Sequence, residues 1–448
     1  MNALSPSEDG EDVACAWAAD TAEGSPGPET SSSSTSESQK GTARLPEIVV
    51  EERSDSLIGI ADSSTQGTVG QQQLEERPIS RPGEVLETMP GVIVTQHSGD
   101  GKANQYFLRG FNLDHGTDMA CSFNGIPINL PSNAHGEGYL DLNFLIPELI
   151  QKIDYGKGPY FANVGDFGSA GWENIQTFQT LPAGIAKMEV GSWNYERGLL
   201  ADSTKVGQGN LLGAFELVHT DGPWDVPENY LKYNGILTYS QGDTSQGFSA
   251  TAMGYHGTWN ATNQIPKLAV AEGLIDRFGN LSPTDGGLTD RYTLSAEYHQ
   301  ADEHSVTKIM GYAYYYNMGL WNNFTFFLDD PVHGDQFEQK DTRWVQGVRA
   351  SRTWFGNWRG MAMENTIGLD IRNDVIHDGL VHTEDRQVLY TLRDDDIVET
   401  NLAPYFENKI QWLPWFRTVA GFREDFINFN NKNNFTYAKN GPNPADSG

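Results

Sequence analysis

After residue 182 the chain alternates apolar and polar positions with a period of two, and the pattern persists to the end. It is clearest in the stretches 231–240, 292–299, 366–372 and 401–412. A strand of this kind has one apolar and one polar face, which suits a soluble sandwich as well as a transmembrane barrel. The predicted strands run for roughly 10 to 14 residues, near the membrane-spanning length, and aromatic residues gather at their ends. These two features favour a transmembrane β-barrel.

The predicted connections between these strands alternate in length. Ser240–Gln246 and Trp412–Trp415 are short turns, whereas Gly257–Gly287 and Met318–Asp341 are long. Short turns on one rim and long loops on the other are typical of transmembrane barrels. We count roughly ten strands before Phe429, after which the polar sequence indicates the start of another long loop.

Residues 72–182 show a compact α+β pattern instead. Glu84–Met89 is a predicted short helix that ends at Pro90-Gly91, and a second is expected at Pro147–Ile150. Asn124-Gly125 accepts positive φ at both positions, so it predicts a tight type I′ turn between two strands. The predicted strands of this region are 92–95, 105–109, 119–123, 126–129, 153–155 and 174–178.

Two segments precede the compact region. Residues 1–45 are acidic and rich in serine, which predicts a disordered tail. Residues 46–71 form a polar linker that contains the β-prone patch Glu47, Ile48, Val49, Val50 and Glu51. Such a strand can pair with the sheet edge of another protein, although a linker with chance β-branched residues is the alternative. Met1–Lys40 lacks the features of an export signal, so we expect either a start further upstream or an unusual extension.

Charge and cysteine content exclude some classes of protein. The chain has 60 acidic and 30 basic residues, a formal charge of −30, which argues against nucleic acid as a partner. Cys15 and Cys121 lie far apart and are expected to be free, because no CxxC motif or disulfide framework is present. We expect the run Asp394–Asp396 in a solvated loop. No stretch reaches the ~18 uninterrupted apolar residues of a transmembrane helix.

The motifs of common enzymes are missing as well. No GxSxG or HExxH sequence occurs. Gly156 and Gly158 are not followed by a GK[ST] ending, so they allow a bend and do not form a P-loop. We therefore expect neither enzymatic activity nor a bound cofactor.

The segment from Glu47 to Thr180 carries a series of short motifs. Each is weak alone, but they follow one another in the order of a known family. They are Glu47-Ile48-Val49-Val50, Arg81–Leu86, Met89–Val92, Leu108–Phe111, Phe123–Pro127, Ile153–Pro159 and Gly165–Ile175. In this order they resemble the N-terminal plug of TonB-dependent outer-membrane receptors, and the resemblance extends over nearly everything after residue 45.

The resemblance implies an architecture and a function. The fold would be an α+β plug domain at 72–182 followed by an incomplete antiparallel transmembrane β-barrel at 183–448, with roughly ten of about 22 strands. The implied function is TonB-dependent uptake of a scarce, bulky nutrient, most of all a siderophore or another metal chelate. The implied partners are TonB with its inner-membrane energising complex, the small ligand and outer-membrane lipid. Because so few strands are present, we expect a truncated chain.

The resemblance also implies roles for individual residues. Glu47–Glu51 would pair with a strand of TonB. Arg109 resembles an arginine that pairs with carboxylates of the barrel lumen, although bonding to carbonyls of the plug is an equal alternative. Ligand binding at the plug apex is expected from Asp114, His115, Asn133, His135, Glu137 and Tyr139. Two imidazoles and a carboxylate can bind a metal directly, but polar loop residues more often face water or cap turns.

Two rival functions remain open. A signal-transducing receptor shares the plug and barrel but needs an additional folded N-terminal domain. A surface adhesin or a non-functional remnant fits a truncated chain. One departure from the family pattern stands out: small residues usually follow Ala170-Gly171, whereas this chain has Trp172-Glu173. We expect this bulk to alter the packing of the plug.

Overall fold

The computed structural model describes residues 60–96 and 99–435. We divide them into a plug, residues 60–182, and a wall, residues 183–435, each built on its own sheets. The predicted TonB-pairing segment Glu47–Glu51 and the tail before it lie outside the described residues. No helix among the described residues is long and apolar enough to cross a membrane.

The plug is built on a six-stranded sheet with the order β1-β2-β8-β9-β6-β7. Its strands are β1 (Ile60–Ser63), β2 (Gln66–Gly70), β6 (Met119–Phe123), β7 (Ile126–Pro127), β8 (Ile150–Lys157) and β9 (Gly171–Thr177). The sheet therefore begins at residue 60, inside the segment predicted as a linker, rather than at 72. β2 pairs with β8, which is distant in sequence, so a local pattern cannot reveal that β1 and β2 belong to the plug.

Shorter elements complete the plug. A three-stranded sheet contains β3 (Val92–Thr95), β4 (Gln105–Leu108) and β5 (Phe111–Asn112), and the helices are α2 (Gln71–Glu75), η1 (Pro82–Thr88) and η2 (Pro147–Leu149). Between β6 and β7, Asn124 has φ 48° and Gly125 has φ 80°, which confirms the predicted tight turn. η1 starts where the Glu84 carboxylate accepts the backbone N–H groups of Ser80 (2.7 Å) and Arg81 (3.1 Å).

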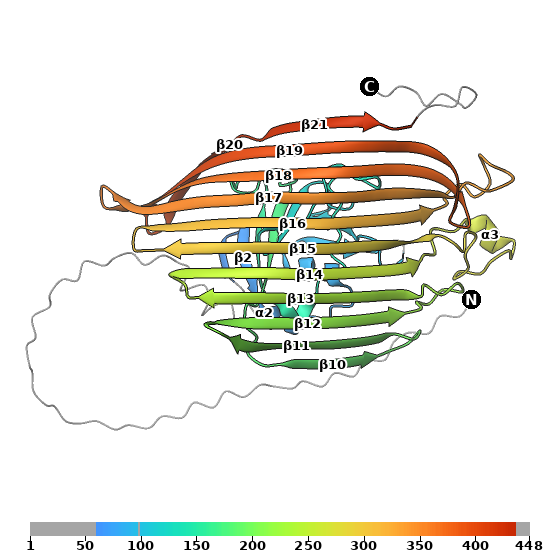
Figure 1. Cartoon of the computed structure of the whole chain (residues 1–448), viewed down its shortest axis with the longest axis horizontal. Helices are drawn as coiled ribbons and strands as arrows, with labels where there is room; N and C mark the ends of the chain where they lie inside the picture. Colours follow the sequence, from blue (N-terminus) through green and yellow to red (C-terminus); the bar gives the residue numbers. More distant parts are fainter. Residues whose placement is uncertain (1–59, 97–98, 436–448) are drawn as a thin grey trace, which may run out of the picture. The chain divides into compact units, whose positions relative to one another are not determined.

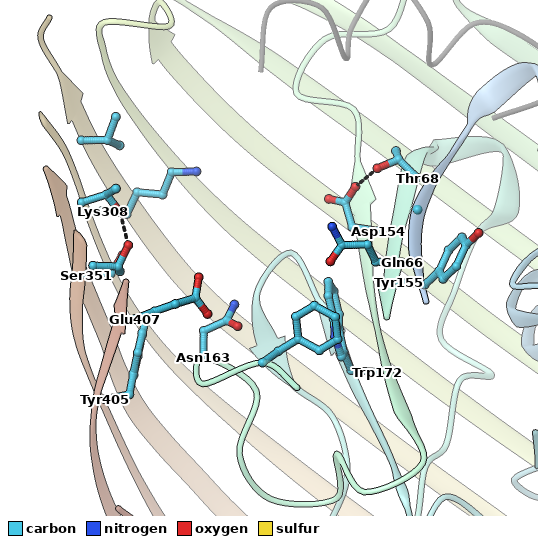
Figure 2. Close-up of a pocket in the computed structure, with 15 residues that line it drawn as sticks. Gln66, Thr68, Asp154, Tyr155, Asn163, Trp172, Lys308, Ser351, Tyr405 and Glu407 are labelled. Atoms are coloured by element: carbon cyan, nitrogen blue, oxygen red, sulfur yellow. Dashed lines mark hydrogen bonds between the residues drawn. The ribbon is translucent and has the colours of Figure 1, made fainter. Parts of the chain in front are cut away.

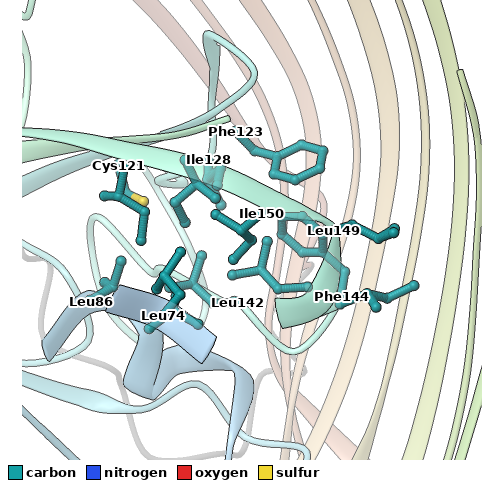
Figure 3. Packing of buried hydrophobic residues seen from close by; sticks show 14 of the residues in the cluster. Leu74, Leu86, Cys121, Phe123, Ile128, Leu142, Phe144, Leu149 and Ile150 are labelled. Carbon is teal, nitrogen blue, oxygen red and sulfur yellow. The ribbon is translucent and has the colours of Figure 1, made fainter. Parts of the chain in front are cut away.

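The six-stranded sheet has one apolar and one polar face, because side chains alternate along each strand. Val69, Ile153 and Ile175 point to the apolar face and are at most 3% exposed. They pack with residues of the helices and of the loop before η2, among them Leu74, Leu86 and Leu142 (Figure 3). The polar face carries Thr68, Ser122, Asp154, Asn174 and Gln176.

The wall is a twelve-stranded antiparallel sheet, and Figure 1 shows its strands side by side in sequence order. They are β10 (Ile185–Val190), β11 (Glu196–Val206), β12 (Gly209–Thr220), β13 (Tyr230–Gly242), β14 (Gln246–Asn260), β15 (Gly286–Ala301), β16 (Ser305–Asn322), β17 (Phe337–Trp358), β18 (Met361–Glu384), β19 (Gln387–Leu413), β20 (Phe416–Arg423) and β21 (Phe426–Asn433). β20 and β21 both pair with β19, end to end, so they are two halves of one interrupted strand. Within the described residues the sheet does not close, since β10 and β20–β21 are its edges.

The structure confirms the predicted fold class and corrects some details. The wall has twelve strands where roughly ten were predicted, and they are 6 to 27 residues long. Turns at 207–208, 243–245, 302–304, 359–360 and 414–415 lie on one rim, and the longer loops 191–195, 221–229, 261–285 and 323–336 lie on the other. The short helix α3 (Lys267–Ala271) belongs to the loop 261–285. Asp394–Asp396 lie within β19, not in a loop, because the β18–β19 hairpin continues to a tight turn at Asp385-Arg386.

Alternation gives the wall two chemically different faces. Leu294, Ile367 and Phe422 are 54–64% exposed on the face away from the plug. On the face toward the plug, Asp341 is 0% exposed and Arg343 1%. The polar face of the wall is thus buried against the plug, while its apolar residues point outward.

Candidate functional site

The apex of the plug consists of two loops, residues 113–118 and 128–146. The first loop turns sharply at Asp114, with φ 48°, and at Gly116, with φ 124°. A Cβ atom on Gly116 would lie 2.6 Å from the Cβ of Leu140 and 2.8 Å from the carbonyl oxygen of Gly138. Only glycine fits this position, so the two loops approach each other closely.

A chain of hydrogen bonds links the apex to the wall. His115 Nδ1 lies 2.9 Å from the carbonyl oxygen of Asn104, and its Nε2 lies 3.2 Å from Nε2 of His135. His135 Nδ1 lies 2.9 Å from Oε1 of Gln339 in β17, whose amide nitrogen donates to the Ala134 carbonyl at 2.6 Å. The carbonyl oxygen can only accept, so His115 Nδ1 carries its proton. The amide oxygen of Gln339 also only accepts, so His135 Nδ1 carries a proton as well, and one of the two Nε2 atoms donates to the other.

Two further predicted residues stabilise this pair. The Tyr139 ring lies 5.7 Å from His115 and 5.6 Å from His135, and its hydroxyl accepts the Ala103 N–H at 3.1 Å. Asn133 accepts the His135 N–H at 2.9 Å and donates its amide to Asp341 of the wall, also at 2.9 Å. The structure thus brings together His115, Asn133, His135 and Tyr139.

The other two predicted ligand residues lie at the edge of this group. Asp114 Oδ1 is 3.9 Å from His115 Nε2, and the side chain of Glu137 is exposed. Nearby, burial lowers the pKa of Lys102 to about 8, with Asp114 opposing the shift. Within the described residues, no three His, Cys, Asp or Glu side chains are placed to hold a metal ion. The apex is therefore a set of hydrogen-bond donors and acceptors rather than a preformed metal cage.

Below the apex, a buried ion cluster of the wall contacts the plug. Arg343 pairs with Asp341 and, at 3.2 Å, with Asp374, and all three are at most 1% exposed. The Arg343 guanidinium also donates to the carbonyl oxygen of Ser132 in the apex loop. Glu399 of β19 accepts the Ser132 hydroxyl. The wall thus holds this loop through both its backbone and its side chain.

Three more arginines of the wall bind carbonyl oxygens of the plug. Arg349 donates to Gly125 and Asn163, both at 2.9 Å, Arg372 donates to Asn129 at 2.8 Å, and Arg423 to Ala162 at 3.4 Å. Each is ion-paired within the wall, to Asp370, Asp374 and Asp425 respectively. Sequence reasoning missed these residues. The sequence does contain a signal for them, namely an arginine and an aspartate two positions apart on one strand, which therefore share a face. The three pairs are Asp341/Arg343, Arg372/Asp374 and Arg423/Asp425.

Arg109 lies elsewhere than predicted. It follows β4 in a turn, with φ 54°, and its backbone N–H donates to the Gly91 carbonyl at 2.8 Å. Its side chain is exposed, and within the described residues no ion pair joins it to a carboxylate of the wall. The direction of these plug–wall contacts is therefore the reverse of the predicted one: the arginines belong to the wall, and the oxygen atoms that accept from them belong to the plug.

On the side of β11–β14 the plug and wall share one hydrophobic core, which we call the packed side. Leu199, Leu212, Ile236 and Tyr255 of the wall belong to the same buried cluster as the plug core. An ion pair borders this cluster, with Glu148 of η2 bonded to Arg197 at 2.7 Å. Burial alone would raise the pKa of Glu148, but bonds to Arg197 and Lys187 outweigh it and lower this pKa to about 2.

On the side of β16–β20, which we call the cavity side, two cavities separate plug and wall. The lower cavity, of about 520 Å³, is lined by β2, β8 and the wall residues Lys308 and Glu407, near the rim with the short turns (Figure 2). The upper cavity, of about 570 Å³, extends to Ser132 and Glu137 of the apex loop. The cavity side is therefore polar and incompletely filled.

Comparison with known proteins agrees with this architecture. Residues 60–172 match the family model of the TonB-dependent receptor plug domain. The chain is 16% identical to the unliganded ferric citrate transporter FecA over 85% of its own length, with a TM-score of 0.71. It is 18% identical to the copper transporter OprC over 84%, with a TM-score of 0.64. The corresponding values for the ferric-catecholate import receptor Fiu of E. coli K12 are 13%, 84% and 0.65. The chain spans 59%, 57% and 61% of these three proteins, respectively.

Proposed function

We propose that the chain is a TonB-dependent receptor, a member of a family of transporters and not of enzymes. It would take up a scarce, bulky nutrient across the outer membrane with energy supplied through TonB. A metal chelate is the favoured cargo, since solved structures with this fold include proteins described as ferric citrate, copper and ferric-catecholate transporters. The barrel would lie in outer-membrane lipid with its apolar face outward.

One observation carries this proposal: on its cavity side the plug is held by contacts that can be exchanged. Backbone oxygens of Gly125, Asn129 and Ser132 are bound by wall arginines. Each such hydrogen bond has a charged donor and is worth roughly 1.5–3 kcal/mol net, far less than in isolation, because water replaces it when it breaks. An interface of this kind stays closed at rest and yields to an applied force, which suits a plug that must move during transport.

The force would enter through the predicted TonB-pairing segment. Glu47–Glu51 ends nine residues before Ile60, the first residue of β1. Among the described residues, β1 is the edge strand of the plug sheet and pairs with β2 alone. A strand of TonB paired with Glu47–Glu51 would therefore load the plug at an edge rather than at its core.

The apex loops would meet the cargo from outside. His115, Asn133, His135 and Tyr139 present imidazole, amide and phenol groups within one hydrogen-bonded cluster. Asp114 and Glu137, at its margin, have side chains open to approach. We place ligand binding at these six residues, with hydrogen bonds as the main interaction.

The test removes the segment that would bind TonB. Deleting Glu47–Glu51 should abolish energised uptake of the cargo while its binding to the cell surface stays unchanged. A deletion of the same length in the serine run, Ser31–Thr35, serves as the control and should leave uptake intact. Uptake that persists without Glu47–Glu51 would show that this segment is not the TonB handle.

The same two assays test the apex. Replacing His115 and His135 together by alanine breaks the chain of hydrogen bonds to Gln339 and should weaken ligand binding at the surface. Uptake should then fall only through the loss of bound ligand. Unchanged affinity of the double variant would exclude these imidazoles from the binding site.

A further inference from the structure

The polar face of the plug sheet points to the cavity side. Its side chains bond to one another: Asp154 accepts from Thr68 and from Gln176, both at 2.6 Å, and Ser122 donates to Asn174 at 2.8 Å. Thr68, Ser122, Asp154 and Asn174 also line the two cavities. The plug sheet is thus apolar toward the plug core and polar toward the cavities, so its polar face borders space that can hold water.

The two cavities are neighbours in one line. Asp154, Asn163 and Trp172 line both of them. The upper cavity reaches Ser132 in the apex loop, and the lower one reaches Lys308, close to the short-turn rim. Together they trace a route along the plug surface from the ligand side to the opposite rim, with Trp172 at the junction.

Trp172 is held at this junction by another aromatic ring. Its indole lies 5.4 Å from the Phe161 ring at an interplanar angle of 77°. Both rings lie over Gly156, because a Cβ atom there would come within 2.2 Å of the indole nitrogen and 2.6 Å of Phe161 Cε2. The buried indole N–H has no hydrogen-bond partner within the described residues. The ring is thus kept in place by packing alone and can swing without breaking a polar contact.

The lining of the route has more carboxylates than cations. The upper cavity contains Glu137, Asp154, Asp166, Asp370, Asp374 and Glu399 against Arg349, Arg372 and Arg423. All three arginines are already paired with aspartates. Burial raises the pKa of Glu173, which also lines this cavity, well above its ordinary value, and burial raises the pKa of Asp166 as well. A passage lined in this way favours cations over anions.

We propose that Trp172, backed by Phe161, is the gate of a passage between plug and wall that conducts small hydrophilic solutes, cations in preference to anions. The inference rests on the proposed transport function, because the passage lies at the plug–wall interface that must open for the bulky cargo. Each cavity has the size of a small-molecule site. Bulkier cargo requires the plug itself to move. The gate also assigns a role to the bulky side chain at residue 172, which lines both cavities.

The experiment measures ion conductance of the full-length receptor in planar lipid bilayers, without TonB and without cargo. Trp172→Ala should raise the conductance at least about tenfold, since that factor corresponds to only about 1.4 kcal/mol. Trp172→Phe keeps a ring at the junction and should stay closed. Gly156→Ala displaces the rings of both Trp172 and Phe161, so it should open the passage although Trp172 itself is not substituted. In a KCl gradient the reversal potential of the open variants should indicate selectivity for K⁺.

A matched control removes a tryptophan outside the route. Trp344 is 60% exposed on the outward face of β17, and Trp344→Ala should conduct no more than the unchanged receptor. Closed behaviour of both Trp172→Ala and Gly156→Ala would overturn the gate, and selectivity for Cl⁻ would overturn the cation preference. Because the assay needs neither TonB nor ligand, its failure is distinct from a failure of the proposed uptake function.

Discussion

On its packed side the plug shares a hydrophobic core with β11–β14, whereas on its cavity side it faces β16–β20 across two cavities bridged by arginines. Both sides contain ion pairs, such as the partly buried Glu148–Arg197 on the first and the buried Asp341–Arg343 on the second. They differ in what fills the space between these ions. On the packed side, apolar side chains fill the space between plug and wall. On the cavity side, this space stays open and polar side chains line it.

This difference indicates which side moves. Separating apolar surfaces costs roughly 25 cal/mol per Å² and nothing compensates for it. Breaking a hydrogen bond in a gap that admits water costs little, because water takes over the bond. The packed side therefore anchors the plug, and the cavity side is where plug and wall part.

The largest expected effect comes from the buried ion cluster on the cavity side. Replacing Arg343 by methionine leaves the buried Asp341 without its ion-pair partner, leaves Asp374 with Arg372 alone, and frees the Ser132 carbonyl. We expect the free energy of unfolding in detergent to fall by about 3–5 kcal/mol. The loop around Ser132 should also become accessible to protease.

A matched arginine tests the specificity of this effect. Arg352 lies on the outward face of the same strand, where it donates to the Ser305 hydroxyl at 3.3 Å and lies over the Trp354 ring. Arg352→Met should change stability by less than about 1 kcal/mol, as expected for an exposed polar contact. Equal losses in both variants would show that the buried cluster does not secure the plug.

The next effect concerns the packed side. Leu212 is 1% exposed within the shared core, and Leu212→Ala should lower the free energy of unfolding by about 2–5 kcal/mol through the cavity it creates. The loop around Ser132 should stay protected from protease, unlike in the Arg343 variant. Leu200, which is 65% exposed, provides the control. Plug loosening by Leu212→Ala without a loss of stability would reverse the assignment of the two sides.

The smallest expected effect is a pH dependence of the packed side. The pKa of Glu148 is lowered to about 2 from an ordinary value of 4.5, so the unfolded chain binds its proton first as the pH falls. The stabilisation is complete above pH 4.5 and is lost as the pH falls toward about 2. It amounts to roughly 1.5–3 kcal/mol, as for hydrogen bonds to charged groups. Glu148→Gln should flatten this part of a stability–pH curve, and an unchanged curve would remove Glu148 from the interface energetics.

Local sequence was sufficient for several elements of the fold. The Asn124-Gly125 turn and the strand at 92–95 formed where predicted, because the turn needs only positive φ and the strand follows directly from its residues. The alternating pattern also predicted a wall with two different faces. The alternating pattern could not predict pairing between distant segments, such as that of β2 with β8, so β1 and β2 were assigned to a linker.

The sequence predicted only the part of the candidate site that local motifs mark. The apex residues lie in two loops that the motifs mark, and four of them meet in one hydrogen-bonded group. The family resemblance suggested Arg109 as the plug–wall link, with bonding to carbonyls of the plug as an equal alternative. The structure instead uses Arg343, Arg349, Arg372 and Arg423, whose partners are backbone carbonyls that no side-chain pattern encodes.

By itself the sequence determined the order of plug and wall, the strand periodicity and the face on which each side chain lies, since these depend on neighbours two to four residues apart. Only the tertiary structure decided which side of the plug is packed and which is open. That outcome depends on how well two surfaces built from distant strands fit each other, and Trp172 illustrates it. In sequence Trp172 is an unexplained bulky residue, and in the fold it stands between two cavities.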